Sequence, residues 1–377
     1  MTPTQTALQR LGKAASPFKR SLLASTTVSS SSSIPKSFMS TTTKPKAVFL
    51  NASRLDYDGK LDWSRLHELC DLHLNPVDAV RDKQEVLDLV QDATIVMTKE
   101  MALPADTFAD FPSSVQLLCE AGTGFNNLPV QAARERGIPV CNIPTYSTQA
   151  VAHMAITYVM NLSVSMFQQQ AMLQEGNRAN FTGPFTLPLS EINDKTIGLI
   201  GGAGRIGTQV AQIALALGMD VHITSRQGSL PADHALYGDP RVHCTDNVES
   251  VLRVADYVSL HTPLNDHTRG SFGRTQLECM KPTAFLINTS RGAVCNEAEL
   301  IECLREGVIA GAGLDVTTTE PPAPDSPLWE LPNVWLSPHT GWRRLETRQR
   351  LVDMTCDNIA SFLQAQSEDE IQNVVNR

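Results

Sequence analysis

Three polar residues that suit acid–base chemistry follow apolar runs in the second half of the sequence. Arg291 lies in "LINTSRGAVCNEAEL", Glu320 in "GLDVTTTEPP" and His339 in "WLSPHTGW". Each comes just past an expected strand, at the edge where an α/β sheet presents its ligand-binding loops. Arg291 would pair with the carboxylate of a 2-oxo acid, while His339 donates a proton as hydride arrives and Glu320 fixes the imidazole tautomer. Any one of them alone has a bland explanation as a solvated or turn residue, so the prediction rests on the set.

A glycine-rich turn follows the expected strand 196–200. The stretch "GGAGRIG" contains the spacing G-x-G-x-x-G as Gly202, Gly204 and Gly207. Such glycines allow a tight turn, close approach of the backbone to a pyrophosphate, and close packing of the next helix on its strand. Because strand, turn, helix and second strand fit in one unit of about 30 residues, the pattern predicts a dinucleotide site.

The second strand of this unit runs into "VHITSRQGS" without the acidic residue that binds the ribose of NAD. Asp220 opens that strand and would lie roughly 13 Å from its carboxyl end, where a cofactor binds. Ser225 and Arg226 occupy the expected position, and a hydroxyl and a guanidinium favour a 2′-phosphate. The residues therefore favour NADP(H), with NAD(H) also open; the alternative is a surface loop with an incidental arginine.

The rest of the chain alternates short β-rich runs with helical patterns, which is typical of parallel α/β sheets. A first series of strands is expected at 47–50, 94–97, 115–121 and 138–142. Helices are expected at 85–91, 128–136 and 148–170, followed by a polar arm near 178–190. A second series of strands is expected at 196–200, 221–224, 257–261, 284–289, 312–316 and 334–339, and a final helix at 345–364. The fold class is thus α/β with two Rossmann-like or flavodoxin-like parallel-sheet domains.

Composition narrows the class of partner. The 377 residues carry a formal net charge of −9, which argues against nucleic acid as a ligand. No apolar run reaches the roughly 20 residues of a membrane span, so no membrane partner is expected. The eight cysteines are scattered without a C-x-x-C pair, so we expect neither disulfides nor a metal site.

The first 46 residues differ from the rest. They contain seven of the 31 basic residues, no acidic residue and the run Ser29–Ser33. This composition is typical of an organellar transit peptide, which we place at 1–45. Mitochondrial targeting is favoured and a plastid is the alternative; a tail without targeting function would leave the protein in the cytoplasm.

From about Ala93 to Phe362 the chain resembles the D-isomer-specific 2-hydroxyacid dehydrogenase family. The stretches that carry the resemblance include "EAGTGFNNL", "IGLIGGAGRIG", "VSLHTPLNDHTRG", "MKPTAFLINTSRGAVCNEAELIECLREG" and "SPHTGW". The resemblance implies that Arg291, Glu320 and His339 are catalytic. It also implies homodimers and a nucleotide domain inserted in the substrate domain. We accordingly expect a substrate domain at 46–147 and 342–377, and an NAD(P)-binding domain at 148–341.

The same resemblance assigns further contacts by residue. The predicted substrate-binding residues are Ala121, Gly122, Thr123, Gly124, Arg291 and Trp342. The predicted cofactor-binding residues are Thr148, Gly202, Gly204, Arg205, Ile206, Ser225, Arg226, Thr262, Thr289 and Asp315.

Two features bear on the substrate. Trp342, three residues after His339, resembles the branch of hydroxypyruvate and glyoxylate reductases. Arg343 and Arg344 would either reach a second anionic group or coat the closing helix, and we favour the second. The expected activity is reduction of hydroxypyruvate or glyoxylate. The alternatives are another D-2-hydroxy acid such as lactate or phosphoglycerate, and a dinucleotide-sensing binding protein without catalysis.

Overall fold

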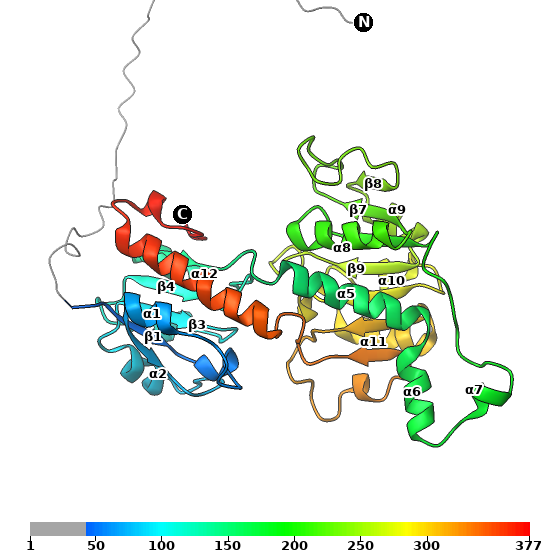
Figure 1. Cartoon of the computed structure of the whole chain (residues 1–377), viewed down its shortest axis with the longest axis horizontal. Coiled ribbons are helices and arrows are strands. Elements are labelled where there is room, and N and C mark those ends of the chain that lie inside the picture. The colour runs from blue at the N-terminus through cyan, green and yellow to red at the C-terminus, as the bar shows by residue number, and fades with distance from the viewer. Residues whose placement is uncertain (1–42) are drawn as a thin grey trace, which may run out of the picture. The chain divides into compact units, whose positions relative to one another are not determined.

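The computed structural model describes residues 43–377. The predicted targeting segment therefore lies almost entirely outside the described residues. Within them the strands form two sheets, and all named strand pairs are parallel. Figure 1 shows the two sheets in two α/β lobes. The predicted fold class is confirmed.

The first sheet has the strand order β2-β1-β3-β4-β5. Its strands are β1 (Lys46–Phe49), β2 (Asp71–Leu74), β3 (Ile95–Thr98), β4 (Leu117–Glu120) and β5 (Val140–Cys141). The inner strands are short runs of buried, mostly apolar residues, as expected for a sheet covered on both faces. The covering helices are α1 (Ser64–Leu69), α2 (Lys83–Val90), α3 (Ala105–Ala109), α4 (Val130–Glu135) and α12 (Leu345–Gln364).

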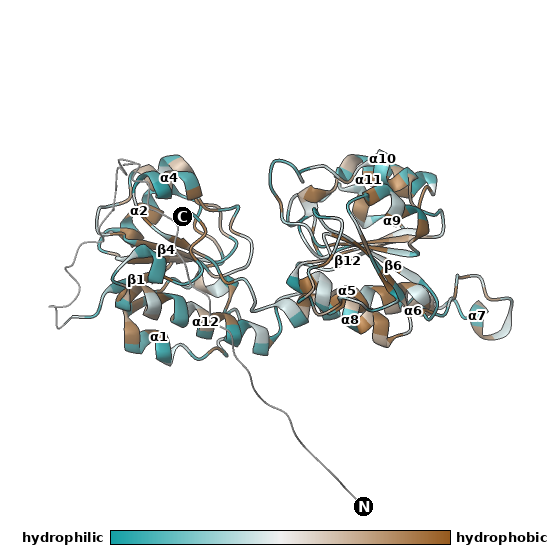
Figure 2. Cartoon of the chain, turned by 90° about the horizontal axis from the view of Figure 1, so that it is seen from above, coloured by the Kyte–Doolittle hydropathy of each residue, from teal (hydrophilic) through white to brown (hydrophobic). Residues whose placement is uncertain are grey.

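The second sheet has the strand order β12-β11-β10-β9-β6-β7-β8. Its strands are β6 (Thr196–Ile200), β7 (Asp220–Thr224), β8 (Val242–Thr245), β9 (Tyr257–Leu260), β10 (Phe285–Asn288), β11 (Gly311–Leu314) and β12 (Val334–Leu336). Its helices are α5 (Thr148–Ser163), α8 (Arg205–Ala216), α9 (Val248–Val254), α10 (Arg274–Glu278) and α11 (Glu297–Glu306). Figure 2 shows this sheet between α5 and α8 on one side and α9, α10 and α11 on the other.

The C-terminal segment returns to the first sheet. Helix α12 contributes Leu351, Cys356 and Ile359 to the buried apolar cluster on one face of that sheet. Beyond it, the backbone N–H of Val375 donates to the carbonyl of Val140 at 2.8 Å, beside β5. The second sheet is therefore inserted in sequence between β5 and α12, as the family resemblance implied. The boundaries at residues 147 and 341 stay a prediction.

The long helix expected over 148–170 is interrupted, so that prediction was wrong in its length. Helix α5 ends at Ser163 and α6 (Met166–Gln174) begins after Ser165, whose φ of 49° is left-handed. The hydroxyl of Ser165 donates to the carbonyl of Pro188 at 2.6 Å, which fastens the break to the returning arm. The arm itself carries α7 (Ala179–Thr182).

Strands β2 and β8 were not predicted. Their side chains are half-exposed or exposed, with the burial pattern of strands at a sheet edge, and both lack a continuous apolar run. The described chain also has short 3-10 turns at Ala52–Arg54, Gly292–Val294, Pro327–Trp329 and Glu368–Glu370.

No single helix within residues 43–377 is long and apolar enough to cross a membrane. The bent pair α5 and α6 has the required length and composition only when its two halves, 64° apart in direction, are taken together.

Candidate active site

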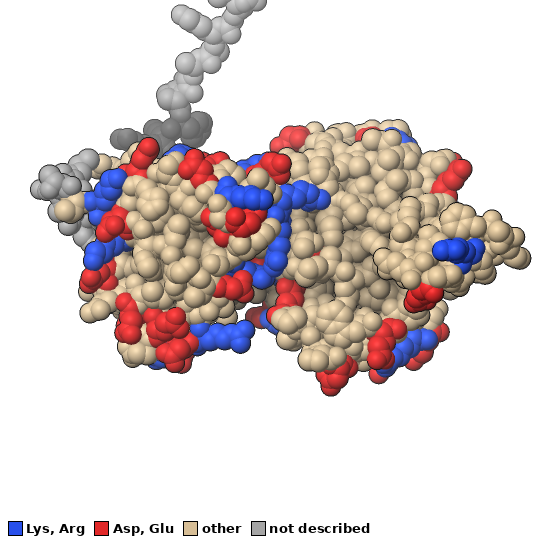
Figure 3. Space-filling model, turned by 60° about the horizontal axis from the view of Figure 1, so that its bottom comes forward, with Lys and Arg blue, Asp and Glu red and all other residues tan. Residues whose placement is uncertain are grey.

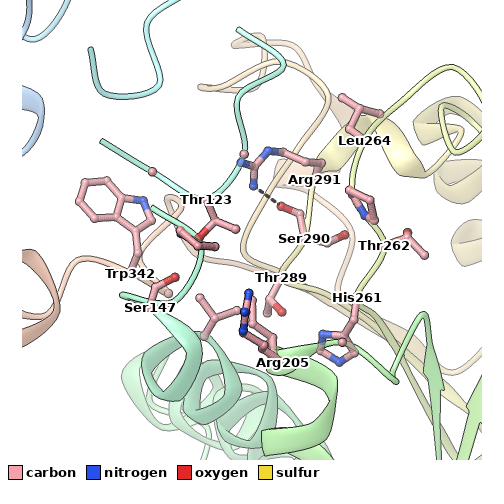
Figure 4. A pocket seen from close by; sticks show the side chains of 18 of the residues that line it. Thr123, Ser147, Arg205, His261, Thr262, Leu264, Thr289, Ser290, Arg291 and Trp342 are labelled. Atoms are coloured by element: carbon pink, nitrogen blue, oxygen red, sulfur yellow. Dashed lines mark hydrogen bonds between the residues drawn. The ribbon is translucent and has the colours of Figure 1, made fainter. Parts of the chain in front are cut away.

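A cavity of about 370 Å³ is lined by residues that follow strands of both sheets. Glu100 follows β3 and the loop Gly122–Asn126 follows β4, while Gly204–Gly207 follow β6. From β9 to β12 the strand ends add His261–Leu264, Thr289–Arg291, Asp315 and His339. The carboxyl ends of parallel strands are where α/β sheets bind ligands, so this cavity is the candidate active site (Figure 4).

His339 and Glu320 form a hydrogen-bonded pair at this cavity. Nδ1 of His339 lies 2.8 Å from Oε2 of Glu320. An ionised carboxylate only accepts hydrogen bonds, so it keeps a proton on Nδ1 and leaves Nε2 for proton exchange with a substrate. His339 lines the cavity and its side chain is 14% exposed, whereas Glu320 lies behind the ring and is not part of the lining.

Arg291 reaches the same cavity from the turn after β10. Its Nη1 donates to the carbonyl of Ser290 at 2.8 Å, a bond drawn in Figure 4. The Arg291 guanidinium rests against the loop after β4, because a Cβ placed on Gly124 would lie 2.0 Å from Nη2. This contact brings a cation next to the backbone of Gly122, Thr123 and Gly124, all of which line the cavity.

Ala121 and Trp342 occupy different places. The backbone N–H of Ala121 donates to the carbonyl of Thr98 at 2.7 Å, and Ala121 lies under the loop rather than in the lining. Trp342 lines the cavity, and its buried Nε1 has no hydrogen-bond partner among the described residues. Nε1 is therefore a free donor at the cavity wall.

Asp315 anchors the loop that carries His339, a role that the sequence did not reveal. Its carboxylate accepts hydrogen bonds from the backbone N–H groups of Thr340 and Gly341, both at 2.8 Å, and from the hydroxyl of Ser337. The backbone N–H of His339 donates to the carbonyl of Asp315 at 2.9 Å. These bonds hold the backbone of His339 at a left-handed φ of 52°, which residues other than glycine rarely adopt. Asp315 also lines the cavity, as a cofactor contact would.

The cavity contains an ion pair that sequence reasoning missed, formed by the consecutive residues Lys99 and Glu100 after β3. Nζ of Lys99, whose side chain is 1% exposed, donates to Oε1 of Glu100 at 3.0 Å. Oε1 of Glu100 also lies 3.6 Å from Nε2 of His339. Burial raises the pKa of Glu100, but Lys99, His339 and Arg54 outweigh burial and hold that pKa well below its usual range. Glu100 is therefore a carboxylate at neutral pH. A charged dipeptide directly after a buried strand was the available sequence signal.

The glycine turn lies where the sequence placed it. A Cβ on Gly207 would lie 2.4 Å from the carbonyl oxygen of Gly202, so helix α8 approaches the turn as only glycine allows. A Cβ on Gly204 would meet only one atom within 4 Å, at 3.8 Å, which leaves room for a ligand over the turn. Arg205 and Ile206 begin α8 and line the cavity together with Gly204. The N-terminus of this helix suits a pyrophosphate.

The register of β6 and β7 excludes Asp220 from the nucleotide site. Asp220 pairs with Thr196 at the start of β6, whereas the glycine turn follows the end of that strand. At the other end of β7, the hydroxyl of Thr224 accepts a hydrogen bond from the backbone N–H of Gly201 at 2.8 Å. Ser225 and Arg226 come next, and the Arg226 side chain is exposed. Both lie outside the lining of the cavity.

Three polar atoms in the cavity wall fit a dinucleotide. Oγ1 of Thr262, Oγ1 of Thr289 and Nε2 of His261 are buried without a hydrogen-bond partner among the described residues. Buried polar groups are normally paired, so these atoms indicate a ligand that pairs with them. Thr148 does not line the cavity: its hydroxyl donates to the carbonyl of Thr145 at 3.2 Å, and its neighbour Ser147 forms part of the wall.

Two other predictions concern residues outside the cavity. Nη1 of Arg344 donates to the carbonyl of Ala150 at 2.6 Å, and the Arg343 guanidinium carbon lies 5.6 Å from the centre of the Trp342 ring. Neither arginine lines the cavity.

All eight cysteines are free, and residues 43–377 contain no group of three or more His, Cys, Asp or Glu side chains placed to hold a metal ion.

Comparisons with known proteins agree on one family. Residues 156–341 match the family model described as "D-isomer specific 2-hydroxyacid dehydrogenase, NAD binding domain". The chain is 33% identical over 323 residues to a hydroxypyruvate reductase of Blautia hydrogenotrophica, covering 85% of this chain and 96% of that one.

Two solved structures have folds similar to that of this chain. One is an NADPH-dependent glyoxylate/hydroxypyruvate reductase from Sinorhizobium meliloti in complex with NADP and malonate, with TM-score 0.72, 28% identity and coverage of 88% of this chain and 97% of that one. The other is a D-lactate dehydrogenase with NAD+ from Lactobacillus jensenii, with TM-score 0.70, 28% identity and coverage of 88% and 99%.

Proposed function

We propose that this chain, which belongs to the D-isomer-specific 2-hydroxyacid dehydrogenase family and is an NAD(P)-dependent oxidoreductase, reduces hydroxypyruvate or glyoxylate to the corresponding 2-hydroxy acid, of D configuration where the product is chiral. The observation that carries the proposal is the meeting of Arg291 and the His339–Glu320 pair at one cavity beside a glycine turn. The names of the relatives add support, since several are hydroxypyruvate or glyoxylate reductases.

Each residue of the set has a distinct task in this reaction. The bound nicotinamide supplies the hydride. Arg291 and the backbone N–H groups of Gly122–Gly124 would hold the carboxylate of the substrate, and Arg291 would polarise the neighbouring carbonyl. His339 would give the proton on Nε2 to the carbonyl oxygen, while Glu320 stabilises the charged ring from Nδ1.

We also propose that NADP(H) is the preferred cofactor. Ser225 and Arg226 follow β7 where it meets the glycine turn, and Arg226 is exposed. No hydrogen bond or ion pair with another described residue engages the Arg226 side chain, so it is free to bind a 2′-phosphate. Arg226→Ala should raise the KM for NADPH at least tenfold and leave that for NADH nearly unchanged.

The experiment that tests the proposal is a steady-state assay of hydroxypyruvate, glyoxylate, pyruvate and oxaloacetate with NADPH and with NADH. Hydroxypyruvate or glyoxylate with NADPH should give the highest kcat/KM. Equal or better use of NADH would remove the role given to Arg226. NADPH binding without turnover of any 2-oxo acid would instead favour a dinucleotide-sensing protein.

Assembly and location are part of the proposal. The helices and arm between residues 160 and 190 expose large apolar side chains, among them Met166, Phe167 and Phe181, the last 77% exposed. The lobe that carries them has few charged side chains on the face drawn in Figure 3. We propose a homodimer through this surface and mitochondrial import directed by residues 1–45. Sedimentation analysis and a fluorescent fusion of residues 1–45 test the two statements separately.

A further inference from the structure

We propose that Glu100 makes the site selective for 2-oxo acids that carry a hydroxyl group on carbon 3, by accepting a hydrogen bond from that hydroxyl. The inference rests on the proposed reduction of 2-oxo acids and names the feature of the substrate that the site recognises. It assigns to Glu100 the discrimination between hydroxypyruvate and its analogues without the hydroxyl.

The position of Glu100 relative to His339 carries the inference. Oε1 of Glu100 lies 3.6 Å from Nε2 of His339, the nitrogen that faces the reacting carbonyl oxygen. This distance is longer than a hydrogen bond, so the two groups are neighbours without being committed to each other. A substrate whose carbonyl oxygen contacts Nε2 would place a carbon bonded to that carbonyl within reach of Oε1. We assign this place to carbon 3, because Arg291 would hold the carboxylate carbon.

The carboxylate of Glu100 keeps acceptor capacity on the oxygen that lies nearer to His339. Oε2 accepts from Nη2 of Arg54 at 3.1 Å, and Oε1 accepts from Nζ of Lys99 at 3.0 Å. Because each carboxylate oxygen can accept two hydrogen bonds, Oε1 keeps capacity for one more donor. The side chain is 17% exposed and lines the cavity, so a substrate hydroxyl can reach it.

Lys99, the cation nearest to this position, is already committed. Its Nζ donates to Glu100, lies 3.3 Å from the hydroxyl of Tyr146 and lies 3.9 Å from the centre of the Trp342 ring. An ammonium group has three donors, so these neighbours occupy it fully. The carboxylate of Glu100 is thus the group on offer, and it disfavours a substrate whose third carbon carries a second anionic group.

The backbone holds Glu100 in this place. Its φ of 55° is left-handed, and its N–H donates to Oε1 of the fully buried Glu120 at 2.9 Å. Oε2 of Glu120 accepts from the hydroxyl of Thr98 at 2.7 Å and from Nδ2 of Asn127 at 2.8 Å. A side chain fixed this way discriminates better than a mobile one, since no ordering is required when the substrate binds.

The test compares hydroxypyruvate with pyruvate and glyoxylate, which lack the hydroxyl, in the wild type and in Glu100→Gln, using NADPH. A hydrogen bond to a carboxylate corresponds to about 10- to 100-fold in kcat/KM. We expect the wild type to prefer hydroxypyruvate over pyruvate by at least that factor. Glu100→Gln should lose about 10- to 100-fold with hydroxypyruvate and change less than threefold with the other two acids.

Two further variants guard against a general disturbance of the fold. Glu100→Gln leaves Lys99 buried without its counter-charge, so the double variant Lys99→Met with Glu100→Gln removes both charges together. It should show the same selective loss. Glu346→Gln removes an exposed carboxylate outside the cavity and should leave all three rates unchanged.

The pattern across substrates decides the outcome. An equal fall for all three acids in both Glu100 variants would mean that Glu100 only supports the site, and an unchanged preference for hydroxypyruvate would mean that another residue reads the hydroxyl; either result overturns the inference. If the wild type reduces hydroxypyruvate and pyruvate equally well, the inference fails while the proposed function stands. If it reduces none of the acids, the proposed function fails and takes the inference with it.

Discussion

Nδ1 of His339 lies 2.8 Å from Oε2 of Glu320, although the two residues follow different strands, β12 and β11. The strands pair in parallel with Leu314 opposite Leu336, so their carboxyl ends meet at the same edge of the sheet. The loops leaving that edge bring the carboxylate to the Nδ1 edge of the ring and leave Nε2 toward the cavity. The pair is thus a direct product of sheet topology.

Glu320→Gln should lower kcat without weakening cofactor binding. The amide of glutamine offers no charge to stabilise the ring once it is protonated, and it can present a donor to Nδ1, which favours the wrong tautomer. We expect a loss of about 100-fold in kcat and an unchanged dissociation constant for NADPH by fluorescence titration. A variant with normal kcat would remove Glu320 from the mechanism, and Glu346→Gln serves as the matched control.

Asp315→Asn should reduce both stability and turnover. The substitution replaces one acceptor oxygen with a donor that faces Ser337, Thr340 or Gly341. We expect a loss of about 1.5 to 3 kcal/mol in the free energy of unfolding, the range for a hydrogen bond to a charged group. Because the loop carries His339, kcat should fall about tenfold. Weaker NADPH binding with unchanged stability would show that Asp315 acts on the cofactor alone.

Gly124→Ala should displace the Arg291 guanidinium while leaving the fold intact. The added Cβ would lie 2.0 Å from Nη2, the flexible end of the arginine, so the arginine moves rather than the backbone. We expect the KM for the 2-oxo acid to rise at least tenfold with an unchanged melting temperature. Combining Gly124→Ala with Arg291→Lys should cost less than the sum of the two single changes; strict additivity would contradict the contact.

The loss of folding stability at acidic pH should depend on His261. Burial lowers the pKa of His261 from 6.5 to about 4. The unfolded chain therefore binds more protons at this residue between these pH values, and stability falls as pH drops from 6.5 toward 4. One pKa unit corresponds to about 1.4 kcal/mol, and since the residue as a whole is only partly buried we expect of the order of 2 kcal/mol.

His261→Gln isolates this contribution. Burial also lowers the pKa of His222, and this residue contributes equally to the acid dependence of stability in the wild type and in the variant. Urea unfolding at pH 7, 6, 5 and 4.5 should show a shallower decline for His261→Gln. Parallel declines would mean that His261 takes up its proton equally well in the folded state.

Sequence patterns predicted which residues follow the strand ends, but they did not predict the contacts between those residues. Arg291, Glu320 and His339 were found because each follows an apolar strand, and the parallel order of the strands brings such ends together. The role of Asp315 could not be predicted, since its bonds to Thr340 and Gly341 depend on how the next loop folds back.

The remaining differences also have physical causes. No glycine or proline marks the helix break at Ser165 in the sequence. The left-handed backbone of Ser165 is held instead by a hydrogen bond to Pro188, which is distant in sequence. The Lys99–Glu100 pair reads as a solvated dipeptide in the sequence, and only the packing of Trp342 and Tyr146 over Lys99 shows that it is buried.

The proton donated by His339 is the step on which the proposed reduction depends, and a comparison of two enzymes can test it. Excess wild-type or His339→Gln enzyme holding a limiting amount of NADPH would be mixed with saturating hydroxypyruvate in single-turnover experiments, with NADPH binding measured on the same samples. We expect His339→Gln to bind NADPH normally and to transfer hydride at least 100-fold more slowly than the wild type. Hydride transfer at a near-normal rate in His339→Gln would contradict it.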